Sequence, residues 1–335
     1  MVVVLPDPIA LISMSKDTIT CLPIRRYDTT LPLALAAIIN QTKIPDKLII
    51  FDDNDEPRDV REELIYKNLF QMMDIKNIEW EWVYAQKKGT HWNHQIANIM
   101  GYKWVWRMDD DCIPEPNVLR TLLSYAIRKN AGAVGGSILT PPSITPCKAT
   151  GKIDNIALEP NIQWGLITKE QQVEHLHCSF VYRAGIHDYN IGLSRVAHRE
   201  ETLFSYGLHQ KGLKLYVVPD AITWHLKNPE GGIRSETNQE LYLHDEQIFQ
   251  NFMQYKDHTI VVLNGGLGDH IVFSKILPEI KNPIVFSCYP DIVPGYAIAH
   301  AERGFGSIDQ WNIYLKMSQW EWKGSLEDAF RKMYL

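Results

Sequence analysis

The chain has few cysteines and none of the spacings that make cysteines structural. Five of its 335 residues are cysteine, an odd number without a C-x-x-C pair. They are Cys21, Cys112, Cys147, Cys178 and Cys288. Disulfide scaffolds and cysteine zinc sites need paired or closely spaced thiols. We therefore expect reduced thiols and a cytoplasmic protein, without a disulfide framework or a zinc site.

Long apolar runs are also absent. A membrane-spanning helix needs about twenty mostly apolar residues in succession, and the chain has no run of even about eighteen. The N-terminal residues 1–16 are apolar, but they lack a basic start and contain Pro6 and Pro8. They resemble neither a signal peptide nor a membrane span, so any membrane contact is expected to be peripheral.

The third feature missing is an excess of positive charge. The formal net charge is −6 and the isoelectric point is near 6.1. Broad, non-specific binding of nucleic acid needs a basic footprint, so the composition disfavours it, although a local basic groove stays open. With 45% hydrophobic and 22% charged residues, the chain has the composition of a globular protein with one large domain or two.

Apolar strands alternate with helices in the N-terminal part of the chain. Strands are predicted at 19–24, 47–51 and 78–84, and helices at 31–40, at 58–73 and from Thr90 onward. Such alternation is typical of βαβ units, so we expect an α/β fold with a mostly parallel, Rossmann-like sheet. Ligands of these sheets bind beyond the carboxyl ends of the strands.

The pattern continues less regularly downstream. Helices are predicted at 117–128, 200–210 and 239–255, and strands at 131–139, 177–182, 213–218 and 221–225; residues 140–175 are expected to be irregular. The polar segment 228–238 carries paired glycines and is expected to be a mobile loop. A new strand at 259–263, a glycine-rich turn and a strand at 283–286 then predict a small α/β appendage. We therefore divide the chain into domains at 1–257 and 258–335.

Two acidic clusters follow predicted strands. The sequence KWVWRMDDDCIPEP runs from Lys103 to Pro116, and Asp52-Asp53 ends the second strand. Three adjacent carboxylates repel one another unless a cation neutralises them, and Mg²⁺ and Mn²⁺ prefer oxygen ligands. In an extended chain Asp109 and Asp111 point one way and Asp110 the other. A solvated acidic turn is the alternative, but the shared position at strand ends favours one cleft.

Four stretches, in this order, resemble family 2 glycosyltransferases of the GT-A fold. Asp52-Asp53-Asn54 is similar to the family's DDxS-type strand end, and WRMDDDCIPEP to its DxD loop. Residues 199–212 resemble its GEDxDLxxRLxxxG stretch, and residues 215–225 its yxPxAxxxH stretch. The resemblance covers residues 17–227. It departs from the family at Arg199, which replaces the usual Gly, and at Glu201, which replaces the usual Asp.

The resemblance implies transfer of a sugar from a nucleotide-diphosphate sugar, usually UDP-linked, to an acceptor with inversion. Carried over by position, the nucleotide contacts are Pro23, Arg25, Asp52, Asp53, Lys87, Lys88, Asp109 and Asp110. Asp53 would bind the base, although a guanine would satisfy it as well as a uracil. For Lys87 and Lys88, which would meet the diphosphate, a solvated basic turn is the alternative.

The resemblance also implies a metal site and a general base. Asp109, Asp111 and His225 would hold Mn²⁺ or Mg²⁺, and the alternative for His225 is a strand-end histidine packed on the sheet. Glu201 is the candidate base and Glu200 the competing assignment; either could instead complement the helix dipole. The 228–238 loop would act as a lid over bound donor. Trp164 and His177 are weaker candidates for contact with the acceptor.

The acceptor is expected to be a glycan or another macromolecule with a free hydroxyl, and a modified nucleic-acid base is not excluded. A scaffold that binds nucleotide or glycan without turnover is the main alternative. A sugar nucleotidyltransferase would want a glycine-rich loop after the first strand, which the chain lacks. The stretch GGLGDH at 265–270 resembles the start of a heptosyltransferase-like GT-B domain, and an accessory role is expected for it.

Overall fold

The structure is a computed structural model with two compact units. One comprises Met1–Tyr189 with Arg195–Gln239, and the other Asn190–Ser194 with Glu240–Leu335. The residues it describes are 17–85, 87–147, 152–153, 162–227, 239–255, 258–263, 267–287, 289–292, 297–298, 325, 327–328, 331 and 335. No described helix combines the length and apolar character needed to cross a membrane.

The N-terminal part of the larger unit contains the predicted βαβ alternation. Its elements are β1 (Thr18–Ile24), α1 (Leu31–Ile39), β2 (Lys47–Asp52), α2 (Leu64–Ile75), β3 (Glu79–Tyr84), α3 (Thr90–Asn98) and β4 (Trp104–Arg107). Helix α2 starts later than the predicted Arg58. The Asp59 carboxylate accepts hydrogen bonds from the backbone and side chain of Arg61. This local turn competes with the helix before Leu64.

The rest of the unit departs from the prediction in three places, one of which is a short strand at Cys112–Pro114 that was not predicted. Its elements are β5 (Cys112–Pro114), α4 (Val118–Lys129), β6 (Ala133–Leu139), β7 (Gln171–Val173), β8 (Phe180–Arg183), α5 (Glu200–Gln210) and β9 (Leu215–His225). Strand β7 lies in the stretch expected to be irregular. Strand β9 is continuous instead of two strands, because Asp220 takes a φ of 65° and the pairing with β6 shifts register there. A bulge therefore absorbs the Pro219-Asp220 interruption.

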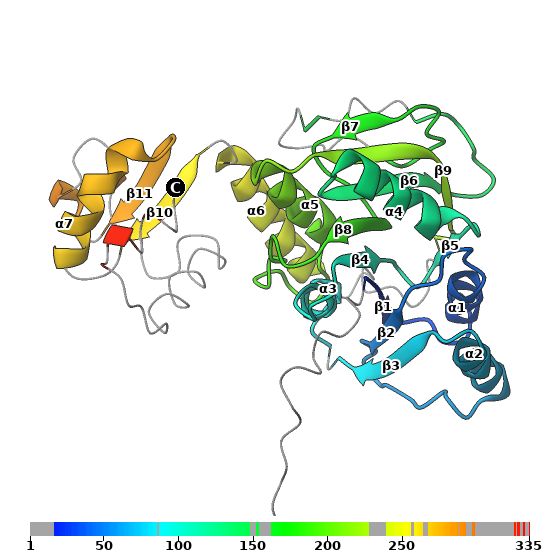
Figure 1. The fold of residues 1–335 in the computed structure, drawn as a ribbon. Helices are drawn as coiled ribbons and strands as arrows, with labels where there is room; N and C mark the ends of the chain where they lie inside the picture. Colours follow the sequence, from blue (N-terminus) through cyan, green and yellow to red (C-terminus); the bar gives the residue numbers. More distant parts are fainter. Residues whose placement is uncertain are drawn as a thin grey trace, which may run out of the picture. The chain divides into compact units, whose positions relative to one another are not determined.

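The strands form a single mixed sheet in the order β3-β2-β1-β4-β8-β6-β9-β5, with β7 paired to β9 (Figure 1). Strands β1, β2, β3 and β4 run parallel to one another, whereas β8 runs antiparallel to its two neighbours, β4 and β6. The carboxyl ends of β1, β2 and β4 therefore share one edge of the sheet. This mixed but mostly parallel arrangement confirms the predicted fold class.

Helices cover both faces of this sheet. On one face the buried side chains of α1, α2 and α4 pack on Leu22, Ile50 and Trp106. On the other face Ala97 of α3 and Phe204 and Leu208 of α5 pack on alternate residues of the same strands. The alternation in β1, with Cys21 on one face and Leu22 on the other, is what a strand buried on both sides requires.

The smaller unit contains a parallel three-stranded sheet. Its elements are α6 (Gln239–Tyr255), β10 (Thr259–Leu263), α7 (Leu267–Ile276), η3 (Leu277–Glu279), β11 (Pro283–Ser287), η4 (Pro290–Ile292) and β12 (Ala297–Ile298). Asp245 of α6 accepts hydrogen bonds from the backbone and hydroxyl of Ser194, which ties residues 190–194 to this unit. The two units divide between Gln239 and Glu240, at the first residues of α6, whereas the predicted domain boundary is at residue 257. The predicted glycine turn at 264–266 lies outside the described residues.

Candidate active site

Two carboxylates and an imidazole meet at the carboxyl edge of the larger sheet. One ligand atom from each of Asp109, Asp111 and His225 lies within 4.8 Å of the other two. Strand pairing fixes them there, because Cys112 of β5 lies opposite His225 of β9 and the Leu226 amide donates to the Asp111 carbonyl at 3.0 Å. Residues far apart in sequence thus form one cluster.

The chemistry of this cluster fits a divalent cation. His225 Nε2 lies 3.3 Å from Asp111 Oδ1, and His225 Nδ1 is buried with no hydrogen-bond partner among the described residues. The imidazole ring stands edge-on to Trp164, with the ring centroids 5.1 Å apart. A ligand set of two carboxylates and one imidazole suits Mn²⁺ or Mg²⁺ better than it suits a soft metal. Burial by itself would raise the pKa of Asp111, but the neighbouring His225 and Arg26 lower it by more. The pKa is therefore below its usual value, and the carboxylate stays ionised.

A buried arginine, Arg107, lies between Asp109 and Glu200. The Arg107 side chain is 1% exposed, and its Nη1 lies 2.7 Å from Glu200 Oε1. Its Nη2 lies 3.3 Å from Asp109 Oδ1. The sequence analysis treated Arg107 only as a strand residue and missed this role. The available signal was a charge inside an otherwise apolar strand, since a fully buried arginine needs a partner.

The two acids that open α5 are in different environments. Glu200 is buried and paired with Arg107; burial raises the pKa of this carboxyl, and the Arg107 guanidinium opposes that rise. Glu201 is partly exposed. Burial is the main cause that raises the pKa of Asp109, and the negative charge of Glu201 adds to the rise. Glu200 therefore supports Arg107 inside the fold, whereas Glu201 lies in the electrostatic field of the acidic loop.

The carboxylate of Asp110 is engaged within the protein. It accepts the backbone amides of Arg25 and Arg26, at 2.7 and 3.0 Å, and pairs with the Arg26 guanidinium. The side chain therefore fastens the turn after β4 to the loop after β1, and the contact of Asp110 with the nucleotide stays a prediction. The alternation of an extended DDD segment explains why it points away from Asp109 and Asp111.

Asp53 and Asp52 also differ. Asp53 is 1% exposed; its Oδ2 accepts the Gly89 amide at 3.0 Å, and its Oδ1 is buried without a partner in the described structure. The carboxylate of Asp52 accepts hydrogen bonds from the Tyr27 hydroxyl and from the amide and side chain of Asn54. Asp52 thus braces the strand end, and Asp53 keeps one oxygen for a further donor.

The family model described as glycosyl transferase family 2 matches residues 20–190, just over half of the chain. The chain belongs to this family. No curated protein sequence matches the chain.

Two solved structures are similar to this family 2 chain. GalNAc-T7, solved with UDP, GalNAc and Mn²⁺, has a TM-score of 0.55 and 15% identity, covering 72% of this chain and 50% of that one. S. aureus TarS has a TM-score of 0.45 and 11% identity, covering 78% of this chain and 48% of that one. The chain thus spans about half the length of each. At this identity the GalNAc-T7 likeness shows the fold alone.

The other predicted nucleotide contacts lie on β1 and in the loops after β1 and β3. Pro23 lies within β1, opposite Phe51, and is buried in the sheet, so the loop begins at Arg25. The Arg25 guanidinium donates to the Asp53 carbonyl at 2.7 Å. Lys87 lies 3.9 Å from the Asp55 carboxylate, and the Lys88 ammonium lies over the Trp92 ring. Neither lysine has a described contact with the acidic loop.

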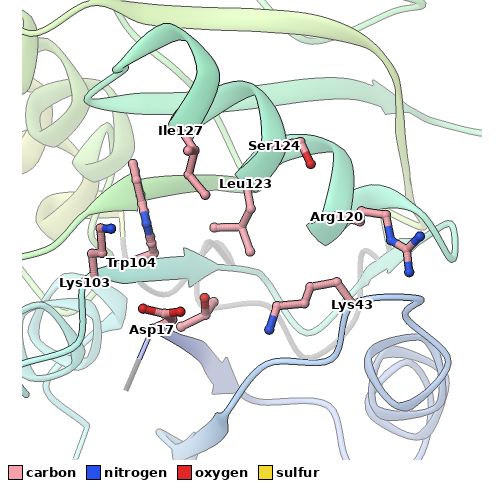
Figure 2. A pocket seen from close by; sticks show the side chains of 9 residues that line it. Asp17, Lys43, Lys103, Trp104, Arg120, Leu123, Ser124 and Ile127 are labelled. Carbon is pink, nitrogen blue, oxygen red and sulfur yellow. The ribbon is translucent and has the colours of Figure 1, made fainter. Parts of the chain in front are cut away.

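A separate hollow lies at the opposite edge of the same sheet. Figure 2 shows Leu123 and Ile127 pointing from α4 toward Trp104, with Lys43, Lys103 and Arg120 around them. Thr18 and Trp104, the first residues of β1 and β4, help to line this cavity of about 250 Å³. It therefore lies at the amino ends of the parallel strands, away from the acidic cluster.

Proposed function

We propose that this family 2 enzyme is metal-dependent and inverting, and that it moves a sugar from a UDP-sugar to a hydroxyl of a glycan or other macromolecule. The observation that carries the proposal is the cluster of Asp109, Asp111 and His225 at the carboxyl edge of the sheet. The unpaired oxygen of Asp53 lies at the end of β2, on the same edge. A nucleoside diphosphate bound along this edge can contact both Asp53 and the cluster.

Asp53 would recognise the base of the donor. Its Oδ1 is buried without a partner in the described structure, which is costly unless a ligand donates a hydrogen bond to it. The uracil N–H is such a donor, and UDP is our choice, although a guanine would satisfy the same oxygen. Arg25 and the Gly89 amide hold this carboxylate in place before the donor arrives.

Asp109, Asp111 and His225 would hold Mn²⁺ or Mg²⁺. When bound, the cation neutralises the charge that develops on the departing nucleoside diphosphate. The GalNAc-T7 structure contains Mn²⁺, which supports this choice without establishing it. Arg107 supports the site by holding one oxygen of Asp109.

Glu201 would act as the general base. The acceptor oxygen attacks the anomeric carbon, the bond to the phosphate oxygen breaks, and Glu201 takes the hydroxyl proton. A positioned base contributes on the order of 10²–10⁴ in rate. The burial of Glu200 and its pairing with Arg107 support Glu201 over Glu200, since the Glu200 carboxylate is already engaged inside the fold.

Two further predictions concern segments beyond this cluster. The lid assigned to residues 228–238 lies outside the described residues and stays a prediction. The C-terminal unit pairs three parallel strands around a small core that includes Val261, Phe273 and Val285. We keep for it the proposed accessory role and the resemblance to a heptosyltransferase-like segment.

The experiment is a thermal-melting series with UDP, GDP, CDP, ADP and dTDP, each with Mn²⁺ or with chelator. A nucleotide at about a hundred times its dissociation constant stabilises the fold by roughly 2.7 kcal/mol. We expect UDP to raise the melting temperature only with metal, and Asp53→Asn and Asp111→Asn to lose the shift. If GDP acts instead, the donor base is wrong; if no nucleotide acts, the chain is a scaffold without a working donor site.

A further inference from the structure

A cavity of about 350 Å³ opens beside the metal-binding cluster. It is lined by the end of β6 at Ile138 and Leu139, by Trp164 and by Lys227. Trp164 contacts the His225 ring edge-on, and Lys227 follows His225 by two residues. The cavity therefore adjoins the candidate metal site, and its volume falls within the range of small-molecule sites.

The order of the strands separates this cavity from the donor base. Asp53 follows β2, the acidic loop follows β4, and the cavity lies at the ends of β6 and β9. In the sheet, β4 stands between β2 and the β6-β9 pair. A nucleotide that reaches from Asp53 to the acidic loop therefore leaves the cavity vacant for the second substrate, on the far side of the transferred sugar.

The walls of the cavity combine an aromatic ring with hydroxyl groups. The half-buried Trp164 ring offers an apolar surface on which the C–H face of a sugar ring can stack. Thr140, Ser143 and Thr145 also line the cavity. Ser143 and Thr145 exchange a hydrogen bond at 3.3 Å, whereas the buried Thr140 hydroxyl has no partner in the described part of the chain. This combination suits a saccharide.

Among the described residues that line the cavity, there is one cation and no acid. The Lys227 ammonium lies 5.2 Å from the centre of the Trp164 ring and forms no ion pair with any described residue. The Lys227 backbone has a φ of 45°, the left-handed region that costs a non-glycine residue about 1–2 kcal/mol. Such strain persists where surrounding structure enforces it, often at ligand sites.

We propose that this cavity is the acceptor subsite, and that it binds a saccharide that stacks on Trp164 and carries a carboxylate or phosphate paired with Lys227. The inference rests on the proposed function, because only a transferase of this kind needs an acceptor beside the metal cluster. The lone lysine, in a cavity whose described lining has no acid, selects anionic saccharides over neutral ones of the same size.

The test measures binding of three probes by ligand-observed NMR, in the presence of UDP and Mn²⁺. The probes are a hexuronic acid methyl glycoside, a hexose phosphate and a neutral methyl hexoside. We expect Lys227→Met to weaken at least one anionic probe about tenfold, the loss expected for a charge-assisted hydrogen bond, and to leave the neutral probe unchanged. Trp164→Ala should weaken all probes that bind the wild type, and Trp164→Phe should do so less.

Lys43→Met is the matched control, because Lys43 lines the hollow at the opposite edge of the sheet (Figure 2). Preference for the hexuronic acid identifies a carboxylate acceptor, and preference for the hexose phosphate a phosphorylated one. The inference is overturned if the neutral probe binds as well as the anionic ones, or if Lys227→Met weakens UDP instead, since the lysine then serves the donor. If wild type fails to bind UDP with metal at all, the proposed function fails first, and the inference with it.

Discussion

Replacing the buried Arg107 should lower the stability of the protein strongly, because this residue forms a buried ion pair. Its guanidinium is buried between Glu200, at 2.7 Å, and Asp109, at 3.3 Å. Replacing Arg107 by Met leaves a buried Glu200 without its cation. Breaking a buried ion pair from one side costs about 3–5 kcal/mol, a large part of the roughly 5–15 kcal/mol that stabilises a domain.

A double-mutant cycle tests this reasoning. Glu200→Gln removes one charge but keeps a polar group against Arg107, so it should cost less than Arg107→Met. In the double variant no lone buried Glu200 charge remains. Its loss of unfolding free energy should therefore be smaller than the sum of the two single-variant losses, by about 2 kcal/mol or more. Urea unfolding followed by tryptophan fluorescence and by circular dichroism measures all four proteins.

The control is Arg61→Met. Arg61 pairs with Asp59 at 2.5 Å, yet the two side chains are 40% and 47% exposed. A surface pair of this kind contributes about 0–1 kcal/mol despite its short distance. If Arg107→Met costs no more than Arg61→Met, or if the Arg107 and Glu200 losses simply add, the buried pair does not hold the site as described.

Three further predictions concern the acids, the backbone and pH. Glu201→Gln should lower kcat by about 10²–10⁴ and leave the UDP melting shift intact, whereas a loss of that shift would place Glu201 in donor binding. Arg199 has a φ of 65° where the family usually has Gly, so Arg199→Gly should leave the melting temperature unchanged or higher; a clear drop would show that the arginine contacts outweigh the strain. Burial lowers the pKa of His187 from 6.5 to about 4, so the unfolded chain takes up its proton first, and stability should fall as pH drops from about 6.5 toward 4. This fall should be smaller in His187→Gln, and equal slopes would refute the assignment.

The sequence predicted most where local pattern and topology agree. Continuous apolar runs such as 47–51 identified the buried parallel strands, because such strands are apolar on both faces. Parallel strands end at one edge, so the strand pattern alone was enough to expect Asp53 and Asp111 in one cleft. The resemblance to family 2 glycosyltransferases then implied that Asp109, Asp111 and His225 would meet, and the structure places one ligand atom of each within 4.8 Å of the other two.

The sequence predicted least where a tertiary contact decides the outcome. The alternation of Asp109, Asp110 and Asp111 shows that Asp110 points away, but only the fold reveals that the loop after β1 receives it. The pairing of Arg107 with Glu200 joins residues 93 positions apart, and no local pattern encodes it. The continuity of β9 depends in the same way on β6, whose register shift accommodates the bulge at Asp220.

Turnover of a donor is the most direct test of the central claim, that Asp109, Asp111 and His225 form the metal site of a nucleotide-sugar glycosyltransferase. Slow hydrolysis of UDP-sugars can be followed by phosphorus NMR without knowing the acceptor. The measurement compares wild type with Asp111→Asn and with Asp74→Asn, a control on the exposed face of α2. We predict that wild type and Asp74→Asn release UDP with Mn²⁺ but not with chelator, and that Asp111→Asn releases none. Equal release by Asp111→Asn, or release undiminished by chelator, would contradict the metal assignment.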